Sequence, residues 1–132
     1  MKESTTLAQY TKMLGESLKQ RSLCFLLRED QVLLGKKKQG FGQGKWLGIG
    51  GRVEQGESIE QTTIRETMEE IGVTPTDLKR VATLNFYFPY VEQPEHWNQQ
   101  VCVFVTHSWE GNVQESEEIT PRWFRTTEIP FE

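Results

Sequence analysis

Three glutamates in the middle of the chain have the residue type and spacing that a divalent cation needs. Glu66, Glu69 and Glu70 belong to a stretch from Gly51 to Val73, with the sequence GRVEQGESIEQTTIRETMEEIGV. On a helix they fall within an arc of about 100°, so their carboxylates converge on one face. A solvated acidic face is the alternative, but each like-charge i,i+4 pair costs about 0.2–0.5 kcal/mol and solubility does not require such crowding. Because Mg²⁺ takes oxygen ligands in octahedral geometry, we predict a metal site here.

A helix that begins at Ser58 is expected to position these acids. Ser58 is followed three residues later by Gln61, which together form a capping box, and Gly72 stands where a C′ glycine would end the helix. The wheel places the apolar side chains opposite the acids, so we predict a core face of Ile64, Met68 and Ile71. Ile59 does not fit that face.

Further charged residues are candidates for the same site. Arg65 is spaced to pair with Glu57 and orient it, so we expect a structural role for Arg65 beside the catalytic acids. Glu118, in the acidic run after the last long strand, is a candidate metal ligand, with a solvated loop acid as the alternative. Lys37 and Arg52 are the candidate phosphate-binding cations, and each has exposure alone as its alternative.

The central stretch resembles the Nudix box, G-x5-E-x7-R-E-U-x-E-E-x-G-U, in which U is a bulky apolar residue. The fixed positions that match are Gly51, Glu57, Arg65, Glu66, Glu69, Glu70, Gly72 and Val73. Thr67 stands where the first U is expected, which is predicted to weaken packing more than chemistry. The resemblance covers the chain from about residue 22 to the C-terminus.

The resemblance implies an α/β fold, the Nudix α/β/α sandwich with a mixed β-sheet, and hydrolysis of a nucleoside diphosphate linked to another group. It also implies Mg²⁺, or Mn²⁺, as the cofactor and the Gly50 carbonyl as a further metal ligand. Outside the box the chain is most similar to the 8-oxo-dGTP diphosphatase branch, through VLLGKKKQGFGQGKW, NFYF and ESEEITPRWF. Ser22, Phe41, Leu47 and Phe86 are predicted to contact the substrate, together with Lys37 and Arg52.

Two features depart from that branch. Leu47 follows Trp46 where the branch usually has an asparagine that hydrogen-bonds the purine edge. The printed sequence stops at Glu132, where relatives continue with base-reading aspartates and a second sandwich helix. We therefore divide the chain into an N-terminal amphipathic helix over residues 1–20 and a Nudix domain over 21–132. One face of the sheet is expected to be covered either by this helix or by a partner subunit in a homodimer.

The remaining elements are expected around the box. The helix near the N-terminus is predicted over 4–20 from the spacing of Leu7, Tyr10, Leu14 and Leu18. A hairpin is predicted from 23–27 and 31–34, then a short strand over 46–49. Pro75 and Asp77 indicate a loop after the central helix. Alternation predicts strands over 84–88 and 101–106, the second with two apolar faces, and a last short strand spans 122–125. The glycines of GFGQGKW are read as turn positions, because Trp46 stands where a Walker motif needs Ser or Thr.

The composition excludes several classes of function. A net charge of −4 gives no electrostatic footprint for duplex nucleic acid. No apolar run approaches the ~20 residues of a membrane span, and the N-terminus has no signal-peptide core, so we expect the cytoplasm. Cys24 and Cys102 lie in apolar runs and are predicted to be buried free thiols.

These observations predict a Mg²⁺-dependent pyrophosphohydrolase that converts a nucleoside triphosphate, with oxidised purines such as 8-oxo-dGTP among the candidates, to a monophosphate and pyrophosphate. Glu66 is the first choice of general base, followed by Glu57 and Glu69. A nucleotide sugar or dinucleoside polyphosphate is an alternative substrate. A non-catalytic nucleotide sensor is an alternative of another class, disfavoured by the intact set of acids.

Overall fold

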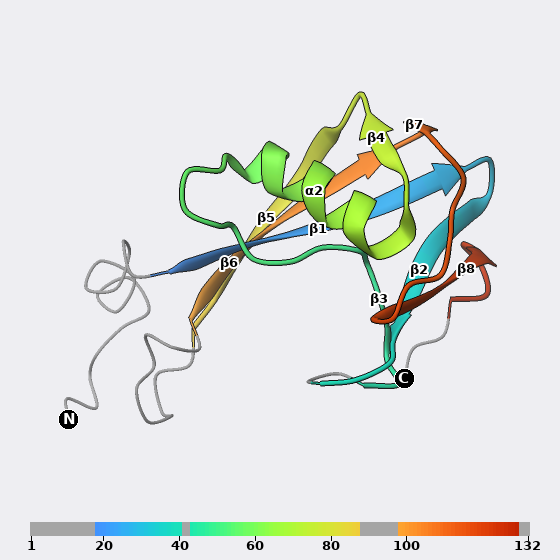
Figure 1. Ribbon diagram of the computed structural model, residues 1–132, viewed down its shortest axis with the longest axis horizontal. Helices are drawn as coiled ribbons and strands as arrows, with labels where there is room; N and C mark the ends of the chain where they lie inside the picture. The colour runs from blue at the N-terminus through green and yellow to red at the C-terminus, as the bar shows by residue number, and fades with distance from the viewer. Residues whose placement is uncertain (1–17, 41–42, 88–97, 130–132) are drawn as a thin grey trace.

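The computed structural model describes residues 18–40, 43–87 and 98–129, which form a mixed β-sheet with one helix packed across it (Figure 1). The elements are β1 (Lys19–Arg28), β2 (Gln31–Lys37), β3 (Trp46–Leu47), α2 (Ile59–Ile71), β4 (Thr74–Thr76), β5 (Lys79–Phe86), β6 (Gln99–Thr106), β7 (Ser108–Glu110) and β8 (Ile119–Arg125). The helix lies over the strands β1, β5 and β6 on one face of the sheet.

The sheet has the order β3-β2-β1-β6-β5, and β8 pairs with β2. β1 and β6 are parallel over their length, from Lys19↔Gln99 to Leu26↔Thr106, whereas the other pairs are antiparallel. The prediction of an α/β fold with a mixed sheet is therefore confirmed. The second helical layer of the predicted sandwich does not lie among the described residues.

The hairpin β1–β2 and the interior position of β6 follow the predicted pattern. β1 turns into β2 through Glu29, which adopts φ 54°, and pairs Leu27 with Val32. β6 lies between β1 and β5, as its two apolar faces predicted. The even-numbered residues in the middle of β1, from Ser22 to Leu26, and at the end of β6, from Cys102 to Thr106, are buried on the side of α2, whereas the odd-numbered residues between them are half-buried.

The ends of α2 are confirmed. The Ser58 side chain accepts from the Gln61 amide at 3.1 Å, and the Gln61 side chain accepts from the Ser58 amide at 2.8 Å. Gly72 ends the helix in the left-handed region, at φ 76°. Both signals depend on residues within the helix itself, which is why the sequence alone was sufficient to locate them.

The predicted core face of α2 is confirmed for Ile71 and wrong for Ile64 and Met68. Ile64 and Met68 are 37% and 52% exposed, whereas Ile59, which did not fit the predicted face, is buried. The buried face consists of Ile59, Thr62, Thr63, Thr67, Glu70 and Ile71. The three threonines are accommodated because each hydroxyl donates to the carbonyl four residues earlier, which leaves no unpaired donor. Thr67 is fully buried, and although burial raises the pKa of the Cys24 thiol on β1, the Thr67 side chain lowers it by a smaller amount.

Other predicted boundaries need correction. Lys19 and Gln20 belong to β1, so the predicted helix over 4–20 cannot include them; the rest of that prediction lies outside the described residues, apart from Leu18. The predicted loop at Pro75 is instead strand β4, which pairs with β7, a strand the sequence did not predict. Three-residue strands are too short to produce a periodic signal.

Two predictions from composition can be compared with the structure. Cys24 and Cys102 are free and buried, as predicted. Among the described residues, the helix is neither long nor apolar enough to cross a membrane.

Candidate active site

The loop before α2 lies so close to β1 at Gly50, and to Glu66 of α2 at Gly51, that a Cβ at either position would require its neighbours to shift. The Ser22 amide donates to the Gly51 carbonyl at 2.9 Å, and Cys24 and Ile49 exchange backbone hydrogen bonds of 2.6 and 3.1 Å. A Cβ on Gly50 would lie 2.6 Å from the Ser22 carbonyl carbon, and one on Gly51 would lie 2.5 Å from the Glu66 carboxyl carbon. The two glycines therefore let the loop lie between β1 and the acids of α2.

Arg65 binds Glu57, as their spacing predicted, and also contacts the acids of α2. Its Nε donates to Glu57 Oε2 at 2.6 Å and one Nη donates to Glu57 Oε1 at 3.0 Å. The other Nη donates to Glu66 at 2.6 Å and to Glu69 at 3.0 Å. The Arg52 carbonyl accepts from Arg65 at 3.2 Å. One guanidinium thus ties the loop before the helix to two of the predicted metal ligands.

The Arg65 contacts change the acidity of both partners. The guanidinium, followed by the Glu54 backbone amide, lowers the pKa of Glu57 to about 2. Its hydrogen bonds to Glu57, Glu66 and Glu69 raise the pKa of Arg65 above its usual value, although partial burial opposes the shift. Glu57 is therefore ionised and a weak proton acceptor at neutral pH.

A cavity of about 370 Å³ brings the other predicted acids together. Its lining residues are Gln39, Glu66, Glu69, Glu70, Ser116, Glu117 and Glu118. Five of the seven are glutamates and none is basic. Glu118, predicted as a ligand from a distant part of the chain, does face the acids of α2. Glu117 and Gln39 were not predicted as site residues; Glu117 adjoins the candidate ligand Glu118 in the chain.

Glu70 is the buried member of this group, at 7% exposed. Burial, a hydrogen bond with Glu66 and the negative charges of Glu66 and Glu118 raise its pKa well above the usual range, and a backbone hydrogen bond from Gly50 opposes them. A buried carboxyl surrounded by other acids requires either a proton or a cation. The donor set, oxygen alone, suits Mg²⁺ or Mn²⁺.

The acids share a cavity without being preassembled as metal ligands. Among residues 18–40, 43–87 and 98–129, no three acid, histidine or cysteine side chains form a group that could hold a metal ion. Arg65 accounts for part of this arrangement, since it binds Glu66 and Glu69.

Neither of the predicted phosphate-binding cations, Lys37 and Arg52, lines this cavity. Lys37 ends β2 opposite Ile119, the residue after Glu118, and is half-buried. The next residue, Lys38, donates its amide to the Glu118 carbonyl at 2.9 Å, and its side chain forms an ion pair with Glu115. The Arg52 side chain is exposed on the loop before α2.

The residues predicted to contact the substrate do not form one pocket. Ser22 is buried on the face beneath α2, and its hydroxyl has no hydrogen-bond partner among the described residues. Leu47 in β3 is 43% exposed, and Phe86 at the end of β5 is 44% exposed. Three other strands lie between β3 and β5 in the sheet. Phe41 lies outside the described residues.

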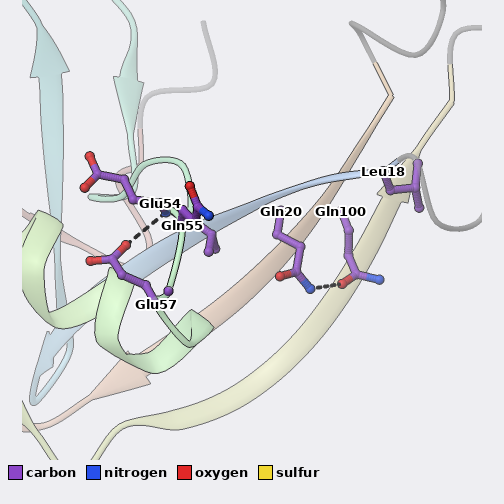
Figure 2. A pocket seen from close by; sticks show the side chains of 8 residues that line it. Leu18, Gln20, Glu54, Gln55, Glu57 and Gln100 are labelled. Atoms are coloured by element: carbon purple, nitrogen blue, oxygen red, sulfur yellow. Dashed lines mark hydrogen bonds between the residues drawn. The ribbon is translucent and has the colours of Figure 1, made fainter.

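A larger cavity, of about 650 Å³, lies beside Glu57 (Figure 2). It is lined by Leu18, Gln20, Val53, Glu54, Gln55, Gly56, Glu57 and Gln100. Figure 2 shows the Gln20 amide donating to Gln100, at 3.1 Å, and the Glu54 amide donating to Glu57, at 3.0 Å. Of the predicted catalytic and metal-binding residues, only Glu57 lines it. The smaller cavity is therefore the better candidate for the reaction.

Comparison with known proteins agrees with this arrangement. The NUDIX domain family matches residues 18–132. An oxidized purine nucleoside triphosphate hydrolase of Danio rerio is 41% identical over 110 residues, covering 83% of this chain and 68% of the relative. The enzyme of the same name from Mus musculus is 42% identical with the same coverage. The crystal structure of a MutT NUDIX hydrolase from Burkholderia pseudomallei aligns with a TM-score of 0.76 and 20% sequence identity. The alignment covers 86% of this chain and 88% of that one, and it supports the assignment of the fold.

Proposed function

Because this chain belongs to the NUDIX domain family, we propose that it is a pyrophosphohydrolase that cleaves a nucleoside triphosphate to a nucleoside monophosphate and pyrophosphate. The observation that carries the proposal is the cavity in which Glu118 joins Glu66, Glu69 and Glu70. Two relatives at 41% and 42% identity, named for hydrolysis of oxidized purine nucleoside triphosphates, support this substrate class.

In the proposed mechanism Glu66, Glu69, Glu70 and Glu118, with the Gly50 carbonyl, hold Mg²⁺, for which Mn²⁺ can substitute. When bound there, the ion would supply Lewis-acid polarisation of the phosphoanhydride and would make water more acidic. Lys37 and Arg52 neutralise the outer phosphate oxygens. Glu66 and Glu69 would be shared between the ion and Arg65, which pairs with both carboxylates.

Glu66 is the proposed general base. Glu57 is disfavoured because its pKa is lowered to about 2 by a two-point contact with Arg65, and a weak base accepts a proton poorly at neutral pH. Glu69 is more exposed, with 55% of its side chain accessible against 19% for Glu66. Arg65 acts as a positioning residue because it orients Glu57, Glu66 and Glu69.

Leu47 of β3 is proposed to contact the base. Its side chain cannot hydrogen-bond a purine edge, so we do not expect discrimination for an 8-oxo group at this position. Oxidised and unmodified purine nucleotides are therefore both candidate substrates.

The test is a screen for pyrophosphate release over nucleoside triphosphates, nucleotide sugars and dinucleoside polyphosphates, with and without Mg²⁺. Glu70→Gln should abolish turnover and leave the fold intact, because it removes a ligand charge without changing the shape of the side chain. Glu60→Gln is the matched control, since Glu60 lies on the same helix with an exposed side chain, 3.8 Å from Arg80. Wild-type turnover by Glu70→Gln would overturn the metal assignment, and release from no nucleotide would favour a sensor.

A further inference from the structure

Glu118 reaches the cavity from a different part of the chain than the other proposed ligands, which belong to α2 and the loop before it. It lies immediately before β8, in a stretch over residues 115–118 that carries three exposed glutamates. We refer to residues 115–118 as the acidic segment. Its carboxylates repel one another and the acids of α2 with which they share the cavity. The position of Glu118 beside those acids therefore requires contacts that hold the segment there.

The backbone of Glu118 is fixed on both sides. Its amide donates to the Ser116 hydroxyl at 3.3 Å, and its carbonyl accepts from the Lys38 amide at 2.9 Å. The Ser116 hydroxyl also accepts from the Ile119 amide at 3.2 Å, and the Ser116 amide donates to the Ile119 carbonyl at 3.0 Å. The acidic segment is thus tied to the end of β2, which pairs with the start of β8 (Figure 1).

The Lys38 side chain supplies a positive charge to the acidic segment. It forms an ion pair with Glu115 Oε2, and the same oxygen accepts from the Thr120 hydroxyl at 3.3 Å. Glu115 thereby connects the end of β2 with residues on both sides of Glu118. Neither Lys38 nor Glu115 lines the cavity, so any effect of the pair on the site must pass through the segment that carries Glu118.

We propose that the ion pair between Lys38 and Glu115 positions the Glu118 carboxylate for the metal, which makes Lys38 and Glu115 positioning residues. This role rests on the proposed assignment of Glu118 as a metal ligand. Partners that orient metal ligands typically contribute about 10- to 100-fold to metal affinity. The pair is partly exposed, with 34% and 57% of the two side chains accessible, and such pairs contribute little to global stability. Loss of the pair should therefore weaken metal binding and leave the domain folded.

The sign of the Lys38 charge distinguishes positioning from simple electrostatics. Lys38→Met removes a positive charge near a cavity lined by five glutamates, so attraction alone would strengthen the binding of a divalent cation. If Lys38 holds Glu118 in place, the same change should instead weaken binding by about 10-fold. Lys36→Met is the matched control, because it removes the same charge from an exposed side chain of β2 whose ammonium lies 5.9 Å from the centroid of the Trp46 ring.

Titration with Mn²⁺, followed by the electron paramagnetic resonance signal of the free ion, measures the affinity without substrate. Lys38→Met and Glu115→Gln should each raise the dissociation constant about 10-fold, whereas Lys36→Met should not. Lys38→Arg, which keeps the ion pair, should retain most of the affinity. The double variant Lys38→Glu with Glu115→Lys should bind more tightly than either of its single variants, because the reversed pair can form. Unchanged or tighter binding by Lys38→Met would overturn the proposal.

Hydrogen exchange in the metal-free protein gives a second readout. The Glu118 and Ile119 amides, which donate to Ser116, should lose protection in Lys38→Met. The Cys24 amide, which donates to the Ile49 carbonyl at 2.6 Å, should exchange as in the wild type. Unchanged protection of Glu118 and Ile119 would refute the positioning role.

The positioning role and the proposed function can be refuted separately. Nucleotide hydrolysis that is lost in Glu70→Gln, together with wild-type Mn²⁺ affinity in Lys38→Met, would leave the proposed function standing and refute the role of Lys38. A wild-type protein that neither binds Mn²⁺ nor hydrolyses nucleotides would refute the proposed function, and the ion pair would then be structural only.

Discussion

Replacing Gly51 with alanine should disable the site by displacing a single carboxylate. A Cβ at Gly51 would lie 2.5 Å from Cδ of Glu66 and 3.0 Å from its Cγ. Carbon atoms in favourable contact lie about 3.5–4.0 Å apart, so the Glu66 side chain must move by about 1 Å. Gly51 does not have a positive φ, so the backbone itself accommodates alanine.

The expected loss of activity follows from this displacement. A misplacement of about 1 Å in a catalytic constellation can cost about 100-fold in rate. The shift also disturbs the 2.6 Å hydrogen bond between Arg65 and Glu66, which helps to orient the carboxylate. We therefore expect kcat of Gly51→Ala to fall about 100-fold, to a value between those of the wild type and Glu66→Gln.

The assay is pyrophosphate release at saturating Mg²⁺ with a nucleotide that the wild type hydrolyses. Circular dichroism and the midpoint of thermal unfolding provide the control, because Glu66 is a flexible side chain whose movement should not unfold the domain. A variant with the wild-type fold and the wild-type kcat would refute the reasoning, since the position of the Glu66 carboxylate would then not matter to the reaction.

The other predictions concern stability and thiol chemistry. Ser58→Ala should lower the free energy of unfolding by about 1 kcal/mol, measured by urea denaturation, because it removes the N-cap of α2; no change would show that the cap contributes nothing. Glu57 has a folded-state pKa of about 2, below the ordinary 4.5, because Arg65 favours its ionised form. Its stabilising effect is therefore present above about pH 4.5 and lost as the pH falls toward 2. The stability difference between wild type and Glu57→Gln, measured by urea titration across this range, should shrink accordingly, and a constant difference would contradict the assignment. Burial raises the pKa of Cys24 to about 11, so the native protein should not react with a thiol reagent at pH 8 until urea unfolds it; rapid reaction in native buffer would show that the thiol is accessible.

The parts of the site that could be predicted from sequence are those encoded by local spacing. The cap at Ser58, the end at Gly72 and the pairing of Arg65 with Glu57 each depend on residues within one short stretch. The position of Glu118 beside the acids of α2 also agreed with expectation, although it depends on the resemblance and on tertiary structure. The β4–β7 ribbon was missed because Thr74–Thr76 and Ser108–Glu110 become strands only through pairing with each other.

The error about the buried face of α2 shows how the site competes with apolar burial. Rotating the helix by about 100°, the angle of one residue, would bury Ile64 and Met68 in place of Thr63 and Thr67. Complete burial of such a side chain is worth about 1.5–3 kcal/mol. The rotation would also expose Ile59 and put Glu60 in its place, so the observed orientation forgoes only part of the gain.

The same rotation would carry Glu66 and Glu70 away from Gly50 and from the cavity shared with Glu118. The threonines reduce the cost of the observed orientation, since Thr63 and Thr67 bury methyl groups while their hydroxyls are satisfied within the helix. A hydrophobicity wheel counts only apolar side chains, so it favours the orientation that would remove the acids from the site. Placement of the carboxylates, and not maximal apolar burial, therefore accounts best for the way α2 lies on the sheet.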